Sequence, residues 1–217
     1  LRVPALVLLL PAIALAQPCD VPALDDPLRL PMPQVGQVSE PGPVVASDFD
    51  RDGASDLVLL EKATSTLRVI RGRRDRDFRP PRLLATPPVT ALYAALELKG
   101  NGKTDLLVES AAGPTVLAGD GRGGFRPLPV TGIEAAFPPE RWSFADLDGD
   151  QLLDVVVFSG GARPSLETFL GNGEGGFRHA TSTPLEGVVD GTQSAELDLG
   201  DTDGDGRVDA VVSAYFP

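Results

Sequence analysis

The sequence predicts an all-β protein built from four copies of one unit of about 50 residues. Three observations support this prediction. An aspartate-rich motif occurs four times, a glycine-rich motif occurs three times between its copies, and no stretch has a sustained helical period. The 24 glycines and 21 prolines in 217 residues suit a chain of many turns, and the 42% hydrophobic content is enough for a buried core.

The acidic motif reads DFDRDGASD, ELKGNGKTD, DLDGDQLLD and DTDGDGRVD, and strand-forming residues follow each copy. Its ninth residues are spaced 49, 49 and 55 residues apart: Asp56, Asp105, Asp154 and Asp209. The glycine motif reads VIRGRRDRDF, VLAGDGRGGF and TFLGNGEGGF. Its copies align one glycine and one phenylalanine in each of three units: Gly72, Gly119, Gly171, Phe78, Phe125 and Phe177. Two motifs that recur together at one period indicate repeated structural units.

Each unit is expected to contain four short antiparallel strands. In the third unit we expect three of them near 141–145, 154–158 and 166–170, with the fourth beginning at Phe177. Phe177, which follows the glycine turn, is expected to pack between neighbouring sheets. Four strands in roughly 40 to 50 residues is the size of a propeller blade, and a blade buries both faces only against its neighbours. The predicted fold is therefore a β-propeller with about four visible blades of four antiparallel strands.

Aspartates occupy positions 1, 3, 5 and 9 of the acidic motif in its first, third and fourth copies. Such carboxylates converge when the chain curls tightly, and position 7 can add a backbone carbonyl. Calcium takes six to eight oxygen ligands, whereas the absence of His and Cys from the motifs disfavours zinc and copper. Position 12 holds Leu59, Val157 or Val212, so the motifs are not EF-hands, which need a bidentate Glu there. The expected side-chain ligands of about three calcium ions are Asp48, Asp50, Asp52, Asp56, Asp146, Asp148, Asp150, Asp154, Asp201, Asp203, Asp205 and Asp209.

The second copy is a degenerate site. Glu97 replaces the first aspartate, Lys99 the second and Asn101 the third, and Asp105 closes the motif. One hypothesis places the Lys99 ammonium where calcium would lie, as a built-in cation beside Glu97 and Asp105; the alternative is an empty polar turn. In the third copy, Gln151 stands where glycine is usual, which predicts a strained turn.

The combination of D-x-D-x-D-G-x-x-D loops with G-x-G-x-G-G-F turns resembles the FG-GAP/VCBS repeat family, over about residues 41 to 217. Those repeats form calcium-binding β-propellers related to integrin α-subunit heads. The resemblance implies calcium at the three aspartate sets, with backbone oxygens from Ala54, Leu152 and Arg207, and ions that are mostly structural. Propellers of this family commonly have about seven blades, so we expect either part of a larger propeller or a four-bladed ring closed by its N-terminal segment.

The organisation that follows begins with a signal peptide, residues 1–16, in which an apolar run ends at Ala14-Leu15-Ala16. Residues 17–40 form an N-terminal segment that can supply an outer strand. The repeat units are expected at 41–88, 89–137, 138–187 and, incomplete, 188–217. With Cys19 as its one cysteine, the chain can form no intrachain disulfide. We expect a secreted protein, extracellular or periplasmic, without membrane insertion after signal cleavage.

The formal net charge of −12 argues against binding to nucleic acid, which needs clustered basic residues. The expected function is a non-catalytic adhesion or ligand-binding module for a glycan or a protein. The alternatives are the propeller platform of an extracellular enzyme and a purely structural repeat of a larger surface protein. No phosphate loop, nucleophile elbow or free acid–base pair favours an enzyme, because the carboxylates are assigned to calcium and His179 is expected at the surface.

Two further features allow a glycan-binding interpretation. The first glycine-type turn holds four arginines, which can bind an anionic glycan or form a solvated hairpin tip partly balanced by Asp75 and Asp77: Arg71, Arg73, Arg74 and Arg76. Trp142 can stack on a sugar, but its place in an inner strand favours packing.

Overall fold

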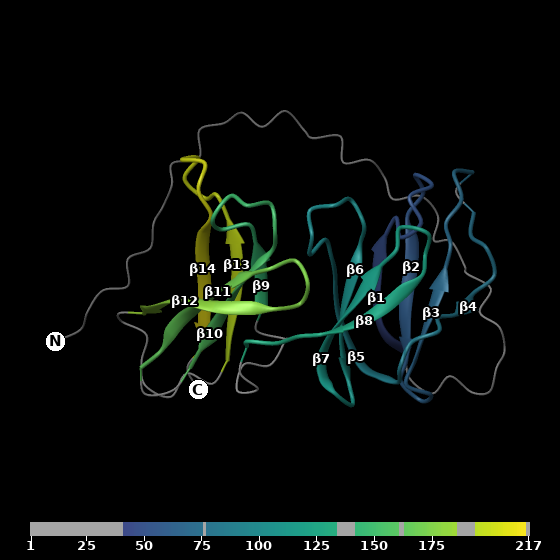
Figure 1. The fold of residues 1–217 in the computed structure, drawn as a ribbon, viewed down its shortest axis with the longest axis horizontal. Helices are drawn as coiled ribbons and strands as arrows, with labels where there is room; N and C mark the ends of the chain where they lie inside the picture. The colour runs from purple at the N-terminus through teal and green to yellow at the C-terminus, as the bar shows by residue number, and fades with distance from the viewer. Residues whose placement is uncertain (1–40, 76, 134–141, 161–162, 186–193, 216–217) are drawn as a thin grey trace. The chain divides into compact units, whose positions relative to one another are not determined.

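The computed structural model describes residues 41–75, 77–133, 142–160, 163–185 and 194–215, all within one compact unit of the chain. These residues form three four-stranded antiparallel sheets and one two-stranded hairpin (Figure 1). The strands of each sheet are hydrogen-bonded in chain order, as in a propeller blade. The all-β prediction and the four-stranded unit are confirmed.

The first blade contains β1 (Pro41–Ser47), β2 (Asp56–Glu61), β3 (Thr66–Ile70) and β4 (Arg82–Leu83). The second contains β5 (Val89–Leu96), β6 (Asp105–Ser110), β7 (Gly113–Gly119) and β8 (Phe125–Pro129). The third contains β9 (Trp142–Ala145), β10 (Asp154–Ser159), β11 (Ser165–Gly171) and β12 (Phe177–Pro184). The hairpin consists of β13 (Ser194–Gly200) and β14 (Asp209–Tyr215). The strands expected in the third unit are therefore found where the sequence predicts them.

The signal peptide, Cys19 and the N-terminal segment lie outside the described residues. Within the described ranges, no helix has the length and apolar character needed to cross a bilayer.

The blades pack face to face through apolar side chains of their second strands. β6 and β10 begin with four and five consecutive buried residues, because a neighbouring sheet covers each of their faces. One cluster joins residues of the first and second blades around Leu60, Leu92 and Leu106. A second cluster joins the second and third blades around Leu107, Val116 and Val157. The core is thus a series of layers between adjacent sheets rather than one central volume.

The phenylalanines after the second and third glycine turns fill the junctions with the preceding blades. Phe177 is 8% exposed and packs in the cluster shared by the second and third blades, as predicted. Phe125 packs against the cluster of the first and second blades, where its ring meets that of Phe49 edge to face at 5.7 Å between centroids. The recurrence of this residue in the sequence therefore reflects blade stacking.

The aligned glycines are explained by a close approach of two backbone segments. A Cβ atom at Gly119 would lie 2.2 Å from the carbonyl oxygen of Thr104, and Cβ atoms at Gly72 and Gly171 would lie 2.1 Å from those of Ser55 and Leu153. In each blade, the glycine that ends or follows the third strand thus touches the eighth residue of the acidic motif, leaving no room for a side chain.

We predict that Gly119→Ala lowers the free energy of unfolding by about 2 kcal/mol or more, because the methyl group forces the two backbone segments apart. Urea denaturation followed by tryptophan fluorescence measures the change. Gly200→Ala is the control, because a Cβ atom at Gly200 meets no heavy atom within 4 Å. Equal stabilities of the two variants would contradict this account of the glycine.

Candidate metal centre

The four acidic motifs form loops that lead into the second strand of each blade and into β14. We call them the first loop (48–56), the second loop (97–105), the third loop (146–154) and the fourth loop (201–209). Positions 4 and 6 of each loop have positive φ angles, between 57° and 84°. Six of these eight residues are glycines, and the exceptions are Arg51, with φ 62°, and Gln151, with φ 70°. The strained turn expected at Gln151 is confirmed, and each exception costs on the order of 1 kcal/mol.

In the first, third and fourth loops, the aspartate at position 1 holds this curled backbone in place. In the first loop, Asp48 accepts hydrogen bonds from the N–H groups of Asp52 (3.1 Å) and Gly53 (2.8 Å). In the third loop, Asp146 accepts from Gly149 (2.7 Å) and Gln151 (2.9 Å). Asp201 accepts in the same way from Gly204 and Gly206 in the fourth loop. The carboxylate at position 1 therefore closes the loop around itself.

The aspartate at position 9 joins the acidic loop to the glycine turn through hydrogen bonds. Asp56 accepts hydrogen bonds from the N–H groups of Phe49 (3.2 Å) and Gly72 (2.8 Å). Asp105 and Asp154 have equivalent donors, with a bond of 2.8 Å from the turn glycine in each case. Burial raises the pKa of all three carboxyl groups, although these hydrogen bonds oppose the shift.

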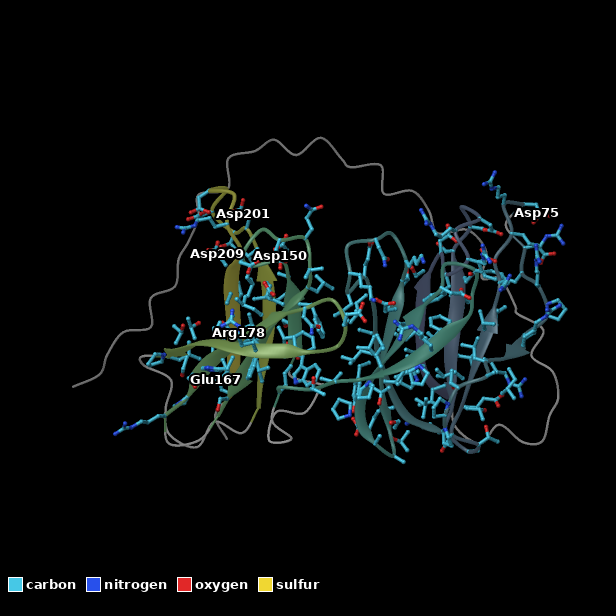
Figure 2. The ribbon with its side chains drawn as sticks, in the orientation of Figure 1. Asp75, Asp150, Glu167, Arg178, Asp201 and Asp209 are labelled. Atoms are coloured by element: carbon cyan, nitrogen blue, oxygen red, sulfur yellow. The ribbon has the colours of Figure 1, made fainter. Side chains whose placement is uncertain are left out.

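Asp209 is held differently. Its carboxylate accepts from the N–H (3.0 Å) and the hydroxyl (2.6 Å) of Thr202, and these bonds lower its pKa. Figure 2 shows Asp209 and Asp201 at the loop that joins β13 and β14.

Carboxylates at positions 1, 3 and 9 converge in three loops. One ligand oxygen from each residue lies within 4.8 Å of the others in three groups: Asp48, Asp50 and Asp56; Asp146, Asp148 and Asp154; Asp201, Asp203 and Asp209. Two such charges repel by about 3 kcal/mol at this distance and an effective dielectric constant of 20. In the first group, Asp50 Oδ1 is buried and has no hydrogen-bond partner. An oxygen-only donor set with an unsatisfied buried oxygen fits a divalent cation.

The aspartate at position 5 of these loops does not join the carboxylate group and bonds to the loop backbone instead. Asp52, Asp150 and Asp205 lie outside the three groups, and each accepts a hydrogen bond from the N–H of the residue at position 7. Their role as ligands, and that of the carbonyl groups of Ala54, Leu152 and Arg207, stays a prediction.

The second loop does not assemble a carboxylate group of this kind among the described residues. Glu97 accepts a hydrogen bond from the N–H of Gly102, and Asn101 accepts one from Lys103. The Lys99 ammonium forms an ion pair with Glu174, in the glycine turn of the third blade. Burial raises the pKa of Asp105, and the nearby charge of Lys99 opposes that rise. Lys99 therefore joins two blades, and the hypothesis of a built-in cation within the loop stays open.

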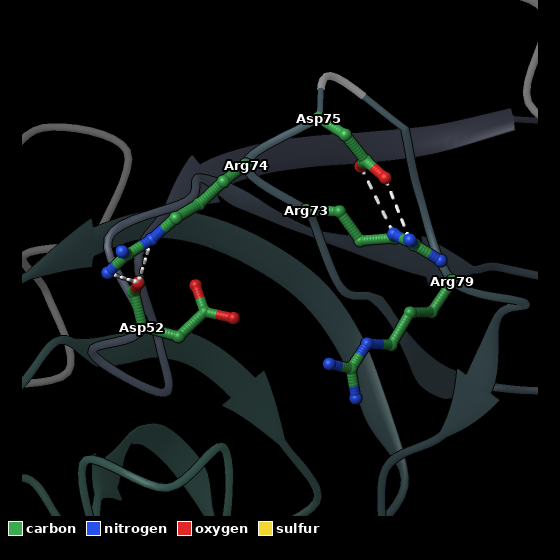
Figure 3. A pocket seen from close by; sticks show the side chains of 5 residues that line it. All are labelled: Asp52, Arg73, Arg74, Asp75 and Arg79. Carbon is green, nitrogen blue, oxygen red and sulfur yellow. Dashed lines mark hydrogen bonds and ion pairs between the residues drawn. The ribbon is translucent and has the colours of Figure 1, made fainter.

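The other candidate residues have clear structural roles. Trp142 is 9% exposed and packs in the cluster between the second and third blades, which confirms the packing interpretation. His179 is exposed, as expected, and bonds to Glu167 Oε2 at 2.8 Å. Figure 3 shows Arg73 paired with Asp75 and Arg74 bound to the carbonyl oxygen of Asp52, while Arg76 lies outside the described residues. Arg71 is not part of the solvated tip, because it forms an ion pair with Asp50 (2.8 Å).

Sequence reasoning missed an arginine that recurs in three units, although the signal was present in the sequence. The residue after each turn phenylalanine is an arginine: Arg79, Arg126 and Arg178. Each lines an open pocket beside the acidic loop of its own blade, shared with Asp52, Asp105 and Asp150 respectively. A basic group thus stands next to each acidic loop of the three complete blades.

The family model of the FG-GAP-like repeat matches residues 98–157 and 146–212. The chain belongs to the FG-GAP-like repeat family. Its match runs from the second loop through β6 to β13 and into β14, and so includes the third and fourth loops in full. A search of curated proteins finds no sequence match to the chain.

Solved structures share the propeller fold of these repeats. A chain of the Photorhabdus luminescens Tc holotoxin pore is 23% identical, with a TM-score of 0.57 over 78% of this chain and 8% of that one. An Agrocybe aegerita lectin that recognises non-reducing terminal N-acetylglucosamine is also 23% identical, with a TM-score of 0.57 over 77% of this chain and 45% of that one. The chain thus spans less than half the length of either protein, and the likeness establishes the β-propeller fold.

We predict that Lys99→Asp adds a divalent-cation site, because positions 1, 3 and 9 of the second loop would then all be acidic, as in the three carboxylate groups. Calorimetric titration with calcium should count one more site than in the unmodified chain. The control is Lys103→Asp, which makes the same change of charge at position 7. If both variants gain a site, or neither does, an acidic residue at position 3 is not what creates the divalent-cation site.

Proposed function

We propose that the chain is an exported β-propeller module that is stabilised by calcium and binds a glycan or a protein without catalysing a reaction. The observation that carries the calcium part is the convergence of three carboxylates in three equivalent loops, one with a buried oxygen lacking a partner. These are oxygen donors alone, and a carboxylate-rich set favours calcium over magnesium, which keeps more water and prefers fewer carboxylates.

Calcium would act here mainly as a folding ligand. Asp56 and Asp154 are buried with raised pKa values, and the carboxylates of each of the three groups repel one another. A divalent cation converts this repulsion into attraction, and a ligand that binds only the folded state stabilises it. Extracellular modules bind calcium with dissociation constants of roughly 10⁻⁴ to 10⁻³ M, which suits an exported protein.

A non-catalytic role is supported by the geometry of the histidine. His179 contacts Glu167, and the hydroxyl groups of Ser165 and Ser182 bond to Glu167 Oε1 rather than to the imidazole. A serine nucleophile activated by histidine would need the serine hydroxyl on the imidazole. The cluster therefore braces β11 and β12 instead of forming a catalytic triad.

Ligand binding is assigned to the pockets beside the acidic loops. The pockets are open, each carries one arginine of the repeated Phe-Arg pair, and calcium in the first and third loops would occupy the neighbouring carboxylates. The lectin with the same fold recognises terminal N-acetylglucosamine, which makes such glycans the first class to test.

We predict that removal of calcium lowers the melting temperature of the mature chain and that Asp146→Ala removes one of three sites. Differential scanning calorimetry with calcium and with chelator measures the first effect, and calorimetric titration counts the sites. Glu196→Ala, an exposed acidic residue in β13, is the control and should leave three sites. A chain that binds no calcium and melts at one temperature under both conditions would refute the calcium assignment.

We predict binding on a glycan array that includes glycans ending in N-acetylglucosamine, and loss of at least ten-fold in affinity when Arg79, Arg126 and Arg178 are all changed to alanine. The control changes two exposed arginines that line none of these three pockets, Arg82→Ala and Arg163→Ala. Binding that survives the triple change would place the ligand elsewhere. An array without any bound glycan would leave a protein ligand or a structural repeat, and would remove the lectin function.

A further inference from the structure

The aspartate at position 3 of the first loop, Asp50, is bound by a side chain, whereas its counterparts in the third and fourth loops are bound by backbone N–H groups. In the third and fourth loops, Asp148 and Asp203 accept the N–H of the residue at position 5, at 3.2 and 3.0 Å. In the first loop that N–H, from Asp52, goes to Asp48 instead. Asp50 Oδ2 is bound by Arg71 Nη1 at 2.8 Å. A guanidinium group thus takes the place of the backbone donor.

The two oxygens of Asp50 have different surroundings. Arg71 binds Oδ2, whereas Oδ1 is buried and without a hydrogen-bond partner, and the Asp50 side chain is only 10% exposed. A buried carboxylate oxygen without a partner is costly. Asp50 belongs to the same group as Asp48 and Asp56, so a cation bound by the group would satisfy this oxygen. The contact with Arg71 therefore leaves one oxygen of Asp50 free for the cation and restricts rotation of the carboxylate.

Arg71 is itself fixed by the second blade. Its Nη2 donates a hydrogen bond of 2.8 Å to the carbonyl oxygen of Arg122, in the glycine turn of that blade. A Cβ atom at Gly123 would lie 2.3 Å from Nη2, so the turn fits closely around the guanidinium. The N–H of Gly123 also donates to the carbonyl oxygen of Phe49, in the first loop, at 3.2 Å. The planar, forked guanidinium suits such a double contact.

This arrangement is confined to the first of the three complete blades. The residue before the turn glycine is Arg71 in the first blade, but Ala118 and Leu170 in the second and third. Neither alternative can bind a carboxylate.

We propose that Arg71 is a positioning residue for calcium in the first loop, and that its bond to the second blade makes calcium affinity there depend on the contact between the two blades. This inference rests on the proposed binding of calcium. Groups that orient a ligand of a metal typically change its affinity 10- to 100-fold when they are removed. The positive charge of Arg71 acts in the opposite direction, by repelling the cation, so the sign of the effect separates positioning from competition.

The experiment is calorimetric titration of the full chain with calcium, comparing Arg71→Met with the unmodified protein. Methionine keeps an apolar stem of similar length but cannot bind Asp50. We expect affinity at one site to fall about 10- to 100-fold while the other sites are unchanged. Arg71→Lys should recover part of the loss, because an ammonium group can still bind Asp50 Oδ2. A role in packing alone would not be rescued in this way.

Arg73→Met is the matched control, because it removes the same charge from the same turn, where Arg73 pairs with Asp75 at an exposed position. The titration is repeated with Asp146→Ala and Asp201→Ala, which leave the first loop as the one intact carboxylate group of the three. Unchanged or increased affinity in Arg71→Met would overturn the inference, and increased affinity would identify Arg71 as a competitor of calcium. Failure of the unmodified chain to bind calcium would instead refute the proposed function, so the two failures are distinguishable.

Discussion

The hydrogen bonds of the ninth aspartate hold each blade together. One oxygen of Asp56 accepts the N–H of Phe49, the second residue of the first loop, and the other accepts the N–H of Gly72, the turn glycine that follows β3. The start of the loop, its end and the glycine turn thus converge on one buried carboxylate. The same bonds recur at Asp105 and Asp154. This explains why the two sequence motifs recur together: each supplies one side of the same contact.

The cost of that contact explains the composition of the loops. A carboxylate buried beside other carboxylates disfavours its own charge, which is why the pKa of Asp56 and of Asp154 is raised. Backbone donors recover part of the energy, and a cation would recover more. In the second loop, where Lys99 replaces an acidic residue, less negative charge has to be compensated. The negative charge that a bound cation would have to compensate therefore differs from one loop to the next.

The fold and the carboxylate groups could be predicted because their signals are local. The strands of the third unit, the junction role of Phe177 and the convergence of positions 1 and 9 all follow from residues close together in one motif or repeated at one period. The contacts between blades could not be predicted in this way. Arg71 meets Arg122, and Lys99 meets Glu174, only because neighbouring blades stack in one particular register. The inward position of Arg71, read from sequence as part of a solvated tip, depends on that stacking.

One further contact between loops bears on how such a protein can change over generations. Gly100 lies against the backbone of Gln151, whose carbonyl oxygen would be 2.3 Å from a Cβ atom at position 100. The N–H of Leu153 also bonds to the carbonyl oxygen of Leu98, at 3.3 Å. Repeat arrays commonly lengthen or shorten by duplication and loss of whole units, since each unit contacts only its neighbours. Here the second and third units are matched to each other, so either one placed beside a different neighbour would have to bring a compatible loop with it.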